Sequence, residues 1–218
     1  MTTSAKSPLR AVVFDLDGTL IDSMPFVLRA FAHALAPYRP ELSETDIFDR
    51  LGGPPERTLL DLIGHAAGAE EALRRLEAFG FSNGHLAQPF AGMREMLMAL
   101  RAAGLKLAVW TGRDRATTAE ILRAHALESF FNVVVCGDDL PTHKPHPAGL
   151  MDILGRLAVE PEAVLFAGDA DADVLGGHGA GIRTILIRHG RKPDELVIAK
   201  AWRVVDTPAQ AYAVVQAG

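Results

Sequence analysis

The stretch Ala11-Val12-Val13-Phe14-Asp15-Leu16-Asp17-Gly18-Thr19-Leu20 decides the fold of this chain. Its short run of apolar residues predicts a fully buried strand, and the run stops at two aspartates on alternate residues. Such a strand would deliver Asp15 and Asp17 to its carboxyl end, the usual ligand-binding edge of an open α/β sheet. The two acids could be a nucleophile and a general acid/base, or could bind a divalent cation. An acidic turn in which Thr19 caps the next segment is the structural alternative.

Length and charge favour a globular enzyme. The 218 residues suffice for one medium-sized domain, with or without a smaller insertion. A formal net charge of -5 offers no basic surface for nucleic acid, so no nucleic-acid partner is expected. Residues 1–8 lack the apolar core of a signal peptide, and no apolar run is long enough for a membrane span, so we expect a cytoplasmic protein with no membrane partner. The single cysteine, Cys136, is expected to be a buried strand residue.

Apolar, β-branched runs recur along the chain and alternate with segments of helical length. After the first strand at residues 10–14, further strands are expected at 105–110, 132–136, 163–167, 182–187 and 203–205. Helices are expected at 92–103, 114–125, 147–157 and 171–180, with a polar connection at 191–200 and a final helix after the last strand. This alternation predicts an α/β fold with a parallel sheet covered on both faces.

Residues 22–87 interrupt the alternation. They contain no convincing strand, and the helix formers Ala, Leu, Glu and Arg dominate windows such as 68–79. Proline-bearing segments flank the interval on both sides and are candidate hinges. We therefore expect a discontinuous α/β core, residues 1–21 and 88–218, with a helical insertion at 22–87.

Polar residues follow each of the first four core strands, and in a parallel sheet all these positions share one edge. They are Asp15 and Asp17, then Thr111-Gly112-Arg113-Asp114, then Asp138, Asp139 and Lys144, and finally Asp169, Asp171 and Asp173. A purely structural cluster of carboxylates would suffer like-charge repulsion, whereas a divalent cation and one lysine would supply compensating charge. Metal binding is the more economical interpretation.

Individual strand ends suggest individual roles. Thr111 and Gly112 suit an anionic oxygen beside a helix start that Asp114 is expected to cap, although a turn explains them equally well. Three prolines stiffen the loop of Lys144, and a rigid lysine suits phosphate. At the fourth strand end, Asp169 is best placed for a metal. Asp173 could support it, and the helix dipole accounts for Asp171.

Taken together, these residues resemble the four ordered motifs of the haloacid dehalogenase superfamily, in particular its phosphotransferase members. The motifs are Asp15-Leu16-Asp17-Gly18-Thr19, Thr111, Lys144-Pro145, and Gly168-Asp169 with Asp173. The insertion resembles the small mobile cap of members similar to phosphoglycolate phosphatase and β-phosphoglucomutase. The resemblance implies a Rossmann-like core with a helical cap, and a monomeric or homodimeric enzyme that hydrolyses a small phosphorylated metabolite with Mg²⁺.

The resemblance also implies residue roles. Asp15 would attack phosphorus to form an aspartyl phosphate, and Asp17 would protonate the leaving oxygen and then activate water. Phosphoryl oxygens would be held by Thr111, Gly112 and Lys144. Mg²⁺ would be held by the side chains of Asp15 and Asp169 and the backbone carbonyl of Asp17, with Asp173 supporting the site.

This chain departs from the family pattern at two positions. Many relatives have Ser where Ala170 stands, and they often have Asn where Gly112 stands. Arg113 follows, and it could bring positive charge to the substrate or only begin a helix. Residues 50–57 resemble the specificity loop of capped relatives, so Arg57 could touch a second anionic group of the substrate; a solvated helix-start arginine is the alternative.

Other functions share parts of the pattern. A haloacid dehalogenase attacks carbon and does not need the second acid, so Asp17 argues against it, whereas a β-phosphoglucomutase-like phosphotransferase uses all four motifs and stays open. A receiver-type phospho-acceptor domain is much shorter and has no helical insertion. The glycines at 176–181 lack dinucleotide-binding spacing and are expected to end a helix. His143 and His146 lack zinc-site spacing and are expected to be solvated.

Overall fold

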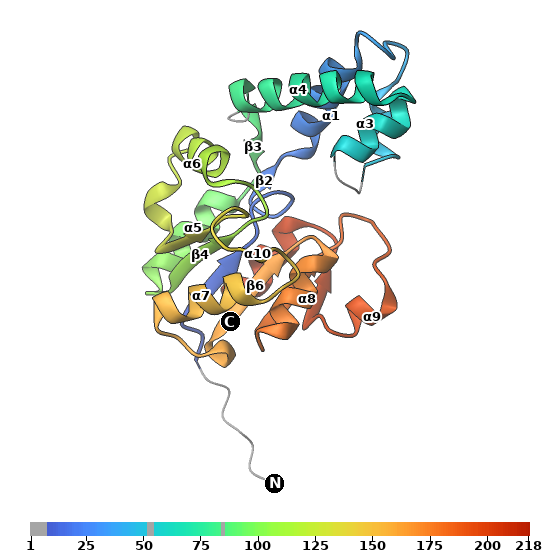
Figure 1. Cartoon of the computed structure of the whole chain (residues 1–218). Helices are drawn as coiled ribbons and strands as arrows, with labels where there is room; N and C mark the ends of the chain where they lie inside the picture. Colours follow the sequence, from blue (N-terminus) through green and yellow to red (C-terminus); the bar gives the residue numbers. More distant parts are fainter. Residues whose placement is uncertain (1–7, 52–54, 84–85) are drawn as a thin grey trace. The chain divides into compact units, whose positions relative to one another are not determined.

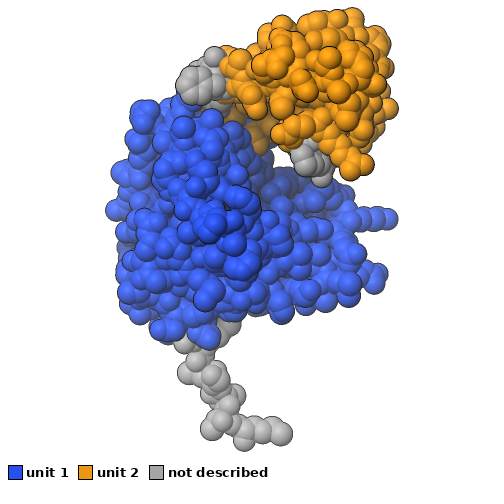
Figure 2. Space-filling view, viewed as in Figure 1, with its two compact units in different colours: residues 1–22, 89–218 blue, residues 23–88 orange. Residues whose placement is uncertain are grey.

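The computed structural model describes residues 8–51, 55–83 and 86–218. The chain divides into two compact units, Met1–Asp22 with Pro89–Gly218, and Ser23–Gln88, which Figure 2 shows in different colours. Within the described residues, no helix has the length and apolar character needed to cross a membrane.

A six-stranded parallel sheet forms the centre of the larger unit, in the order β5-β4-β1-β6-β7-β8 (Figure 1). The strands are β1 (Ala11–Phe14), β4 (Lys106–Trp110), β5 (Val133–Val135), β6 (Val164–Gly168), β7 (Arg183–Ile187) and β8 (Arg203–Val205). Buried apolar runs thus form the parallel sheet that the sequence predicts, and the α/β fold class is confirmed.

Helices lie on both faces of this sheet (Figure 1). They are α5 (Met93–Ala102), α6 (Arg115–Ala124), α7 (Ala148–Leu157), α8 (Asp171–Gly179), α9 (Glu195–Ile198) and α10 (Pro208–Ala217), with 3-10 turns η2 (Glu128–Phe130) and η3 (Pro161–Ala163). The helices α7 and α8 both pack against Trp110, and each meets the indole with a glycine. A Cβ on Gly149 or Gly176 would overlap the indole ring. These glycines let two helices approach the last residue of β4 closely.

One sequence-based expectation needs correction. Residues 191–200 were expected to be a polar connection, but they contain the helix α9. The Asp194 carboxylate caps this helix by accepting the Leu196 N–H at 2.7 Å. Val197, the buried residue of this helix, packs against Val174 and Leu186 and thereby anchors α9 to the larger unit.

The register of the strands brings the residues that follow β1, β4 and β6 to the same edge of the sheet. Phe14 of β1 pairs with Val109 of β4 on one side and with Ala167 of β6 on the other. The two neighbouring strands therefore end one residue beyond the level of Phe14. Asp15, Thr111 and Asp169 follow the ends of three adjacent strands at the middle of the sheet, where strand order changes direction.

The smaller unit is helical, with α1 (Met24–Leu35), α2 (Glu44–Phe48), α3 (Pro55–Ile63) and α4 (Ala66–Asn83). It has its own apolar core, which includes Leu35, Ile47 and Leu59. Pro25 lies in the first turn of α1, where its missing N–H is not needed. The segments flanking the insertion contain two short strands, β2 (Ile21–Asp22) and β3 (Gln88–Pro89), which pair with each other.

Candidate active site

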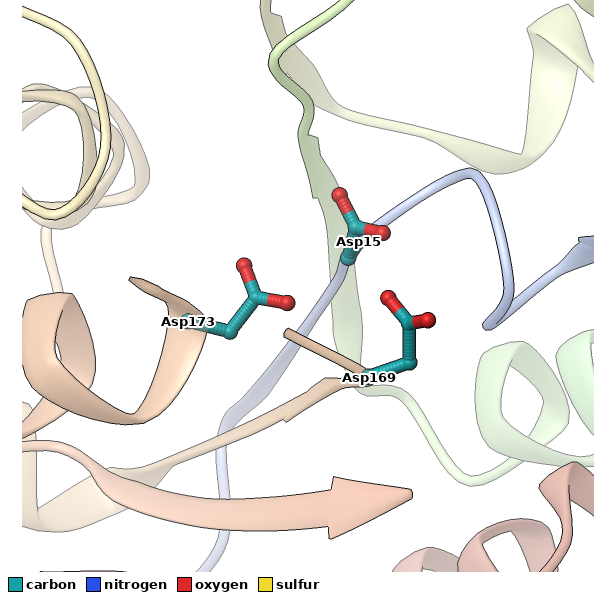
Figure 3. Close-up of side chains that lie close together, drawn as sticks. All are labelled: Asp15, Asp169 and Asp173. Carbon is teal, nitrogen blue, oxygen red and sulfur yellow. The ribbon is translucent and has the colours of Figure 1, made fainter. Parts of the chain in front are cut away.

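Three carboxylates converge at the carboxyl edge of the sheet (Figure 3). Asp15 follows β1, Asp169 follows β6, and Asp173 lies in the first turn of α8. One oxygen from each lies within 4.8 Å of the others. Oxygen ligands at such a spacing can surround a hard divalent cation.

The ammonium of Lys144 pairs with two of these acids. Its Nζ donates to Asp15 Oδ1 at 2.7 Å and to Asp173 Oδ1 at 2.6 Å. The ammonium also lies 4.7 Å from the centre of the Trp110 indole and 5.7 Å from the Phe166 ring. These cation–π contacts stabilise the charged ammonium of Lys144 in addition to its two ion pairs.

Burial and charge set the protonation behaviour of this cluster. Burial raises the pKa of Asp15 well above its ordinary value; Lys144 opposes this, while Asp173 and Asp169 add to it. Burial and, to a smaller extent, the Asp173 charge raise the pKa of Asp169 to about 6. For Lys144, burial favours loss of the proton, but Asp15 and Asp173 outweigh it and hold its pKa above the ordinary value. The lysine therefore stays charged, whereas Asp15 and Asp169 need more positive charge nearby to stay ionised.

Asp173 is fully buried and held rigidly. Its Oδ2 accepts the Ala170 N–H at 3.0 Å, and its own N–H donates to the Ala170 carbonyl at 3.0 Å. Gly168 leaves the space for this carboxylate, because a Cβ at 168 would overlap it. With one oxygen on Lys144 and one on the helix start, Asp173 is well placed to orient the lysine.

Gly18 occupies a position that only glycine fits. Its φ is +73°, and a Cβ there would come within 2.6 Å of Asp169 Cγ. The turn after Asp17 passes directly beside the Asp169 carboxylate, and the backbone N–H of Gly18 donates to the Ile21 carbonyl at 2.8 Å. The glycine of the first motif thus lets two strand ends approach each other.

The carboxylate of Asp17 pairs with Arg113. Arg113 Nε donates to Asp17 Oδ2 at 3.0 Å, and Nη2 donates to Oδ1 at 2.6 Å. From the sequence, Arg113 was expected to contact the substrate or to begin a helix. Nothing in the sequence indicated that Arg113 would pair with Asp17. The two are 96 positions apart, and their pairing depends on the adjacency of β1 and β4.

Thr111 is buried, and its Oγ1 accepts the Arg113 N–H at 3.1 Å. Since that bond uses a lone pair, the hydroxyl hydrogen stays available for donation. Asp114 caps α6 as predicted, accepting the Thr117 N–H at 2.9 Å. At Gly112, a Cβ would meet nothing within 4 Å, so no close packing requires glycine there.

Two residues after β7 reach the same edge, and the sequence reasoning did not name them. His189 Nε2 lies 2.7 Å from the Gly18 carbonyl oxygen, and the Arg191 guanidinium donates through Nη2 to the Asp169 carbonyl oxygen. Arg191 and His189 both act to lower the pKa of Asp169. The strand-end rule that identified the other residues would have identified these too, had it been extended to the strand at 182–187.

The sequence also singled out Arg57, His143, His146 and Cys136. Arg57 is exposed on α3 in the smaller unit, and residues 52–54 of the expected specificity loop lie outside the described residues. His143 and His146 are exposed, and Cys136 is buried directly after β5. The expected roles of Arg57 and the loop therefore stay predictions.

Comparison with known proteins agrees with the fold and the motifs. A family model described as haloacid dehalogenase-like hydrolase matches residues 12–187. The chain is 33% identical to phosphoglycolate phosphatase 1 of Pseudomonas aeruginosa over 83% of this chain and 70% of that protein. It is 29% identical to pyrophosphatase PpaX of Halalkalibacterium halodurans over 87% of this chain and 88% of that protein.

Solved structures show the same fold. A putative β-phosphoglucomutase from Thermotoga maritima is 26% identical and superposes with a TM-score of 0.80, covering 96% of this chain and 99% of the other. A predicted phosphoglycolate phosphatase from Haemophilus somnus reaches a TM-score of 0.81 at 24% identity, covering 97% of this chain and 100% of the other. The chain belongs to the haloacid dehalogenase-like hydrolase family, and the predicted family is confirmed. It is an enzyme whose named relatives are phosphatases and pyrophosphatases.

Proposed function

We propose that this enzyme is a phosphatase that hydrolyses a small phosphorylated metabolite, and that Asp15 carries the phosphoryl group during turnover. The observation that carries the proposal is the placement of the Lys144 ammonium, 2.7 Å from Asp15 and 2.6 Å from Asp173, beside a third carboxylate. Phosphoryl transfer depends mainly on positioning and on neutralising the charge of the transferred group. A nucleophilic carboxylate beside a fixed ammonium and an acidic cation site meets both needs.

The acidic cluster fits Mg²⁺. Asp15, Asp169 and Asp173 offer oxygen donors, and burial and mutual repulsion make the first two carboxylates hard to ionise without added positive charge. Asp15 and Asp169 would hold the ion, because both oxygens of Asp173 already accept hydrogen bonds, one from Lys144 and one from the Ala170 N–H. When bound, the ion would neutralise phosphoryl charge. The family resemblance also assigns the backbone carbonyl of Asp17 as a ligand of the ion.

The protein's own residues supply the remaining steps. Asp15 would attack phosphorus in line with the leaving oxygen, and Asp17 would give that oxygen a proton. Lys144 and the Thr111 hydroxyl would hold the phosphoryl oxygens through charge and hydrogen bonding. Asp17 would then take a proton from the water that hydrolyses the aspartyl phosphate. Both acids come from the turn after β1, two residues apart.

We propose further that the unit Ser23–Gln88 is a cap domain that contributes to substrate selection. It has its own apolar core and is inserted between the first and second motifs. Removal of competing water by such a cap would favour transfer to Asp15. Arg57 stays a candidate for a second anionic group of the substrate.

A screen of phosphate compounds tests the proposal. Purified protein would be assayed with phosphoglycolate, inorganic pyrophosphate, sugar phosphates and an aryl phosphate, each with Mg²⁺ and with a chelator. We expect release of inorganic phosphate from at least one small compound, lost on chelation. Conversion of one hexose phosphate isomer to another without phosphate release would instead support the phosphomutase alternative, and no reaction with any compound would overturn both.

Asp169 predicts a pH-dependent stability of the metal-free protein. Its pKa in the folded state is about 6, against about 3.9 in unfolded chains. Because the folded-state pKa is the higher one, the stability that this carboxyl contributes is present at low pH and is lost as the pH rises through about 6. We expect a loss of up to about 3 kcal/mol from this group between about pH 4 and pH 7. Asp15, whose pKa is also raised, acts in the same direction.

Mg²⁺ should reverse this loss, because it binds the ionised carboxylates. In thermal unfolding, the rise in Tm on adding Mg²⁺ should be larger at about pH 7.5 than at about pH 5. Asp169→Asn should remove most of the rise. Asp152→Asn, at a half-exposed carboxylate on α7, is the matched control and should keep it. An equal rise in Asp169→Asn and the wild type would contradict the assignment of the ion to Asp169.

A further inference from the structure

We propose that Arg113 is a positioning residue that fixes the carboxylate of Asp17 for proton transfer to the leaving group. The inference rests on the proposed phosphatase function and adds to it a residue outside the four motifs. Its basis is the two-point pair between the guanidinium and both oxygens of Asp17, at 3.0 and 2.6 Å.

Arg113 is itself held in place by the backbone. Its N–H donates to Thr111 Oγ1 at 3.1 Å, and its carbonyl accepts the Gly137 N–H at 2.8 Å. A Cβ at Gly137 would overlap the Gly112 carbonyl, so the loops after β4 and β5 are in close contact at this point. The guanidinium therefore extends from a loop anchored at two strand ends.

Asp17 needs such a partner more than Asp15 does. Asp15 directly follows a buried strand and pairs with Lys144, whereas the Asp17 side chain lies in the turn beyond the sheet and is 32% exposed. The fork of an arginine engages both carboxylate oxygens in one plane, and a lysine cannot reproduce this geometry. The pair therefore fixes both the position and the plane of the Asp17 carboxylate.

The pair is compatible with the acid/base role of Asp17. Each carboxylate oxygen has two acceptor sites, and Arg113 uses one on each. The remaining sites can exchange a proton with the leaving oxygen while the guanidinium stays bound. A positioned acid gains from this, because a misplacement of about 1 Å can cost about 100-fold in rate.

Leaving-group dependence separates this role from simple phosphate binding. An alkyl leaving group needs the proton that Asp17 supplies, whereas an aryl leaving group departs readily without it. We expect Arg113→Ala to lower kcat/KM for an alkyl phosphate by about 10- to 100-fold, but for an aryl phosphate by less than about threefold. Arg113→Lys should recover part of the alkyl activity, because it restores a donor but not the two-point pair.

A double-mutant cycle completes the test. In an Asp17→Asn background, Arg113→Ala should change alkyl phosphate kcat/KM by less than about twofold, because a positioning residue acts through Asp17. Arg115→Ala is the matched control: Arg115 makes a similar two-point pair with Asp139 near the start of α6, and its loss should affect both substrates by less than about twofold.

Two results would overturn the inference. Equal losses for aryl and alkyl phosphates would assign Arg113 to binding or folding, and additive effects in the cycle would show that it acts independently of Asp17. Failure of the underlying phosphatase proposal is distinguishable, since it would appear as no phosphate release by the wild type from either substrate, or as undiminished turnover by Asp15→Asn with both.

Discussion

Asp15→Asn is expected to lower phosphate release by at least about 1,000-fold, because it removes the nucleophile and no neighbouring group can replace it. The variant should fold, since Asn has nearly the same shape and Lys144 keeps its pair with Asp173. It also removes a carboxyl whose ionisation is opposed by burial. The measurement is steady-state phosphate release with Mg²⁺, using the best substrate from the screen.

Trapping the intermediate makes this test specific. Acid quenching of the wild-type enzyme during turnover should yield protein heavier by one phosphoryl group, located by mass spectrometry on the peptide that contains Asp15. Asp15→Asn should give no such species. Asp152→Asn, at a partly exposed carboxylate of α7, should behave as the wild type. Turnover by Asp15→Asn at more than a tenth of the wild-type rate would exclude Asp15 as the nucleophile.

Lys144→Met is expected to have the second largest effect, with a loss of about 100- to 10,000-fold in kcat/KM. Methionine keeps much of the side-chain volume above Trp110 but removes the ammonium that pairs with Asp15 and Asp173. Removing one partner of a buried ion pair also costs about 3–5 kcal/mol of stability. Both quantities are measurable, by kinetics and by denaturant unfolding.

A second substitution separates the two effects of Lys144. The double variant Lys144→Met/Asp173→Asn lacks one of the two buried charges that Lys144→Met leaves without the ammonium, so its stability should recover by about 1–3 kcal/mol. Its activity should stay low, because no ammonium faces the phosphoryl group. Recovery of activity together with stability would show that Lys144 acts only through folding.

The core of the fold was predictable because its strands are short, fully buried and apolar. The runs that become β1, β4 and β6 are each followed by polar residues, and parallel topology then assigns Asp15, Thr111 and Asp169 to one edge. Helices were harder to predict where tertiary packing, rather than a periodic pattern of apolar residues, stabilises them. The helix α9 depends on the burial of a single apolar residue, Val197, which no period in the sequence marks.

The details of the site were harder to predict than its location. Because residues that follow parallel strands meet at one edge, the sequence places Lys144 and Asp173 near Asp15. It does not indicate that the Lys144 ammonium donates hydrogen bonds to both carboxylates. The pair between Arg113 and Asp17 depends on side-chain reach across two loops. Side-chain pairing of this kind follows from three-dimensional placement, for which a linear sequence contains no periodic signal.

The pairing of β2 with β3 has a consequence for how such enzymes diversify. Because these strands are hydrogen-bonded neighbours, the chain leaves the α/β unit after Asp22 and returns at Pro89 at adjacent points. The intervening segment can be lengthened, shortened or exchanged without changing the register of the central sheet. One catalytic apparatus can thus be inherited unchanged while the inserted module is replaced, so that new substrates need not bring new chemistry.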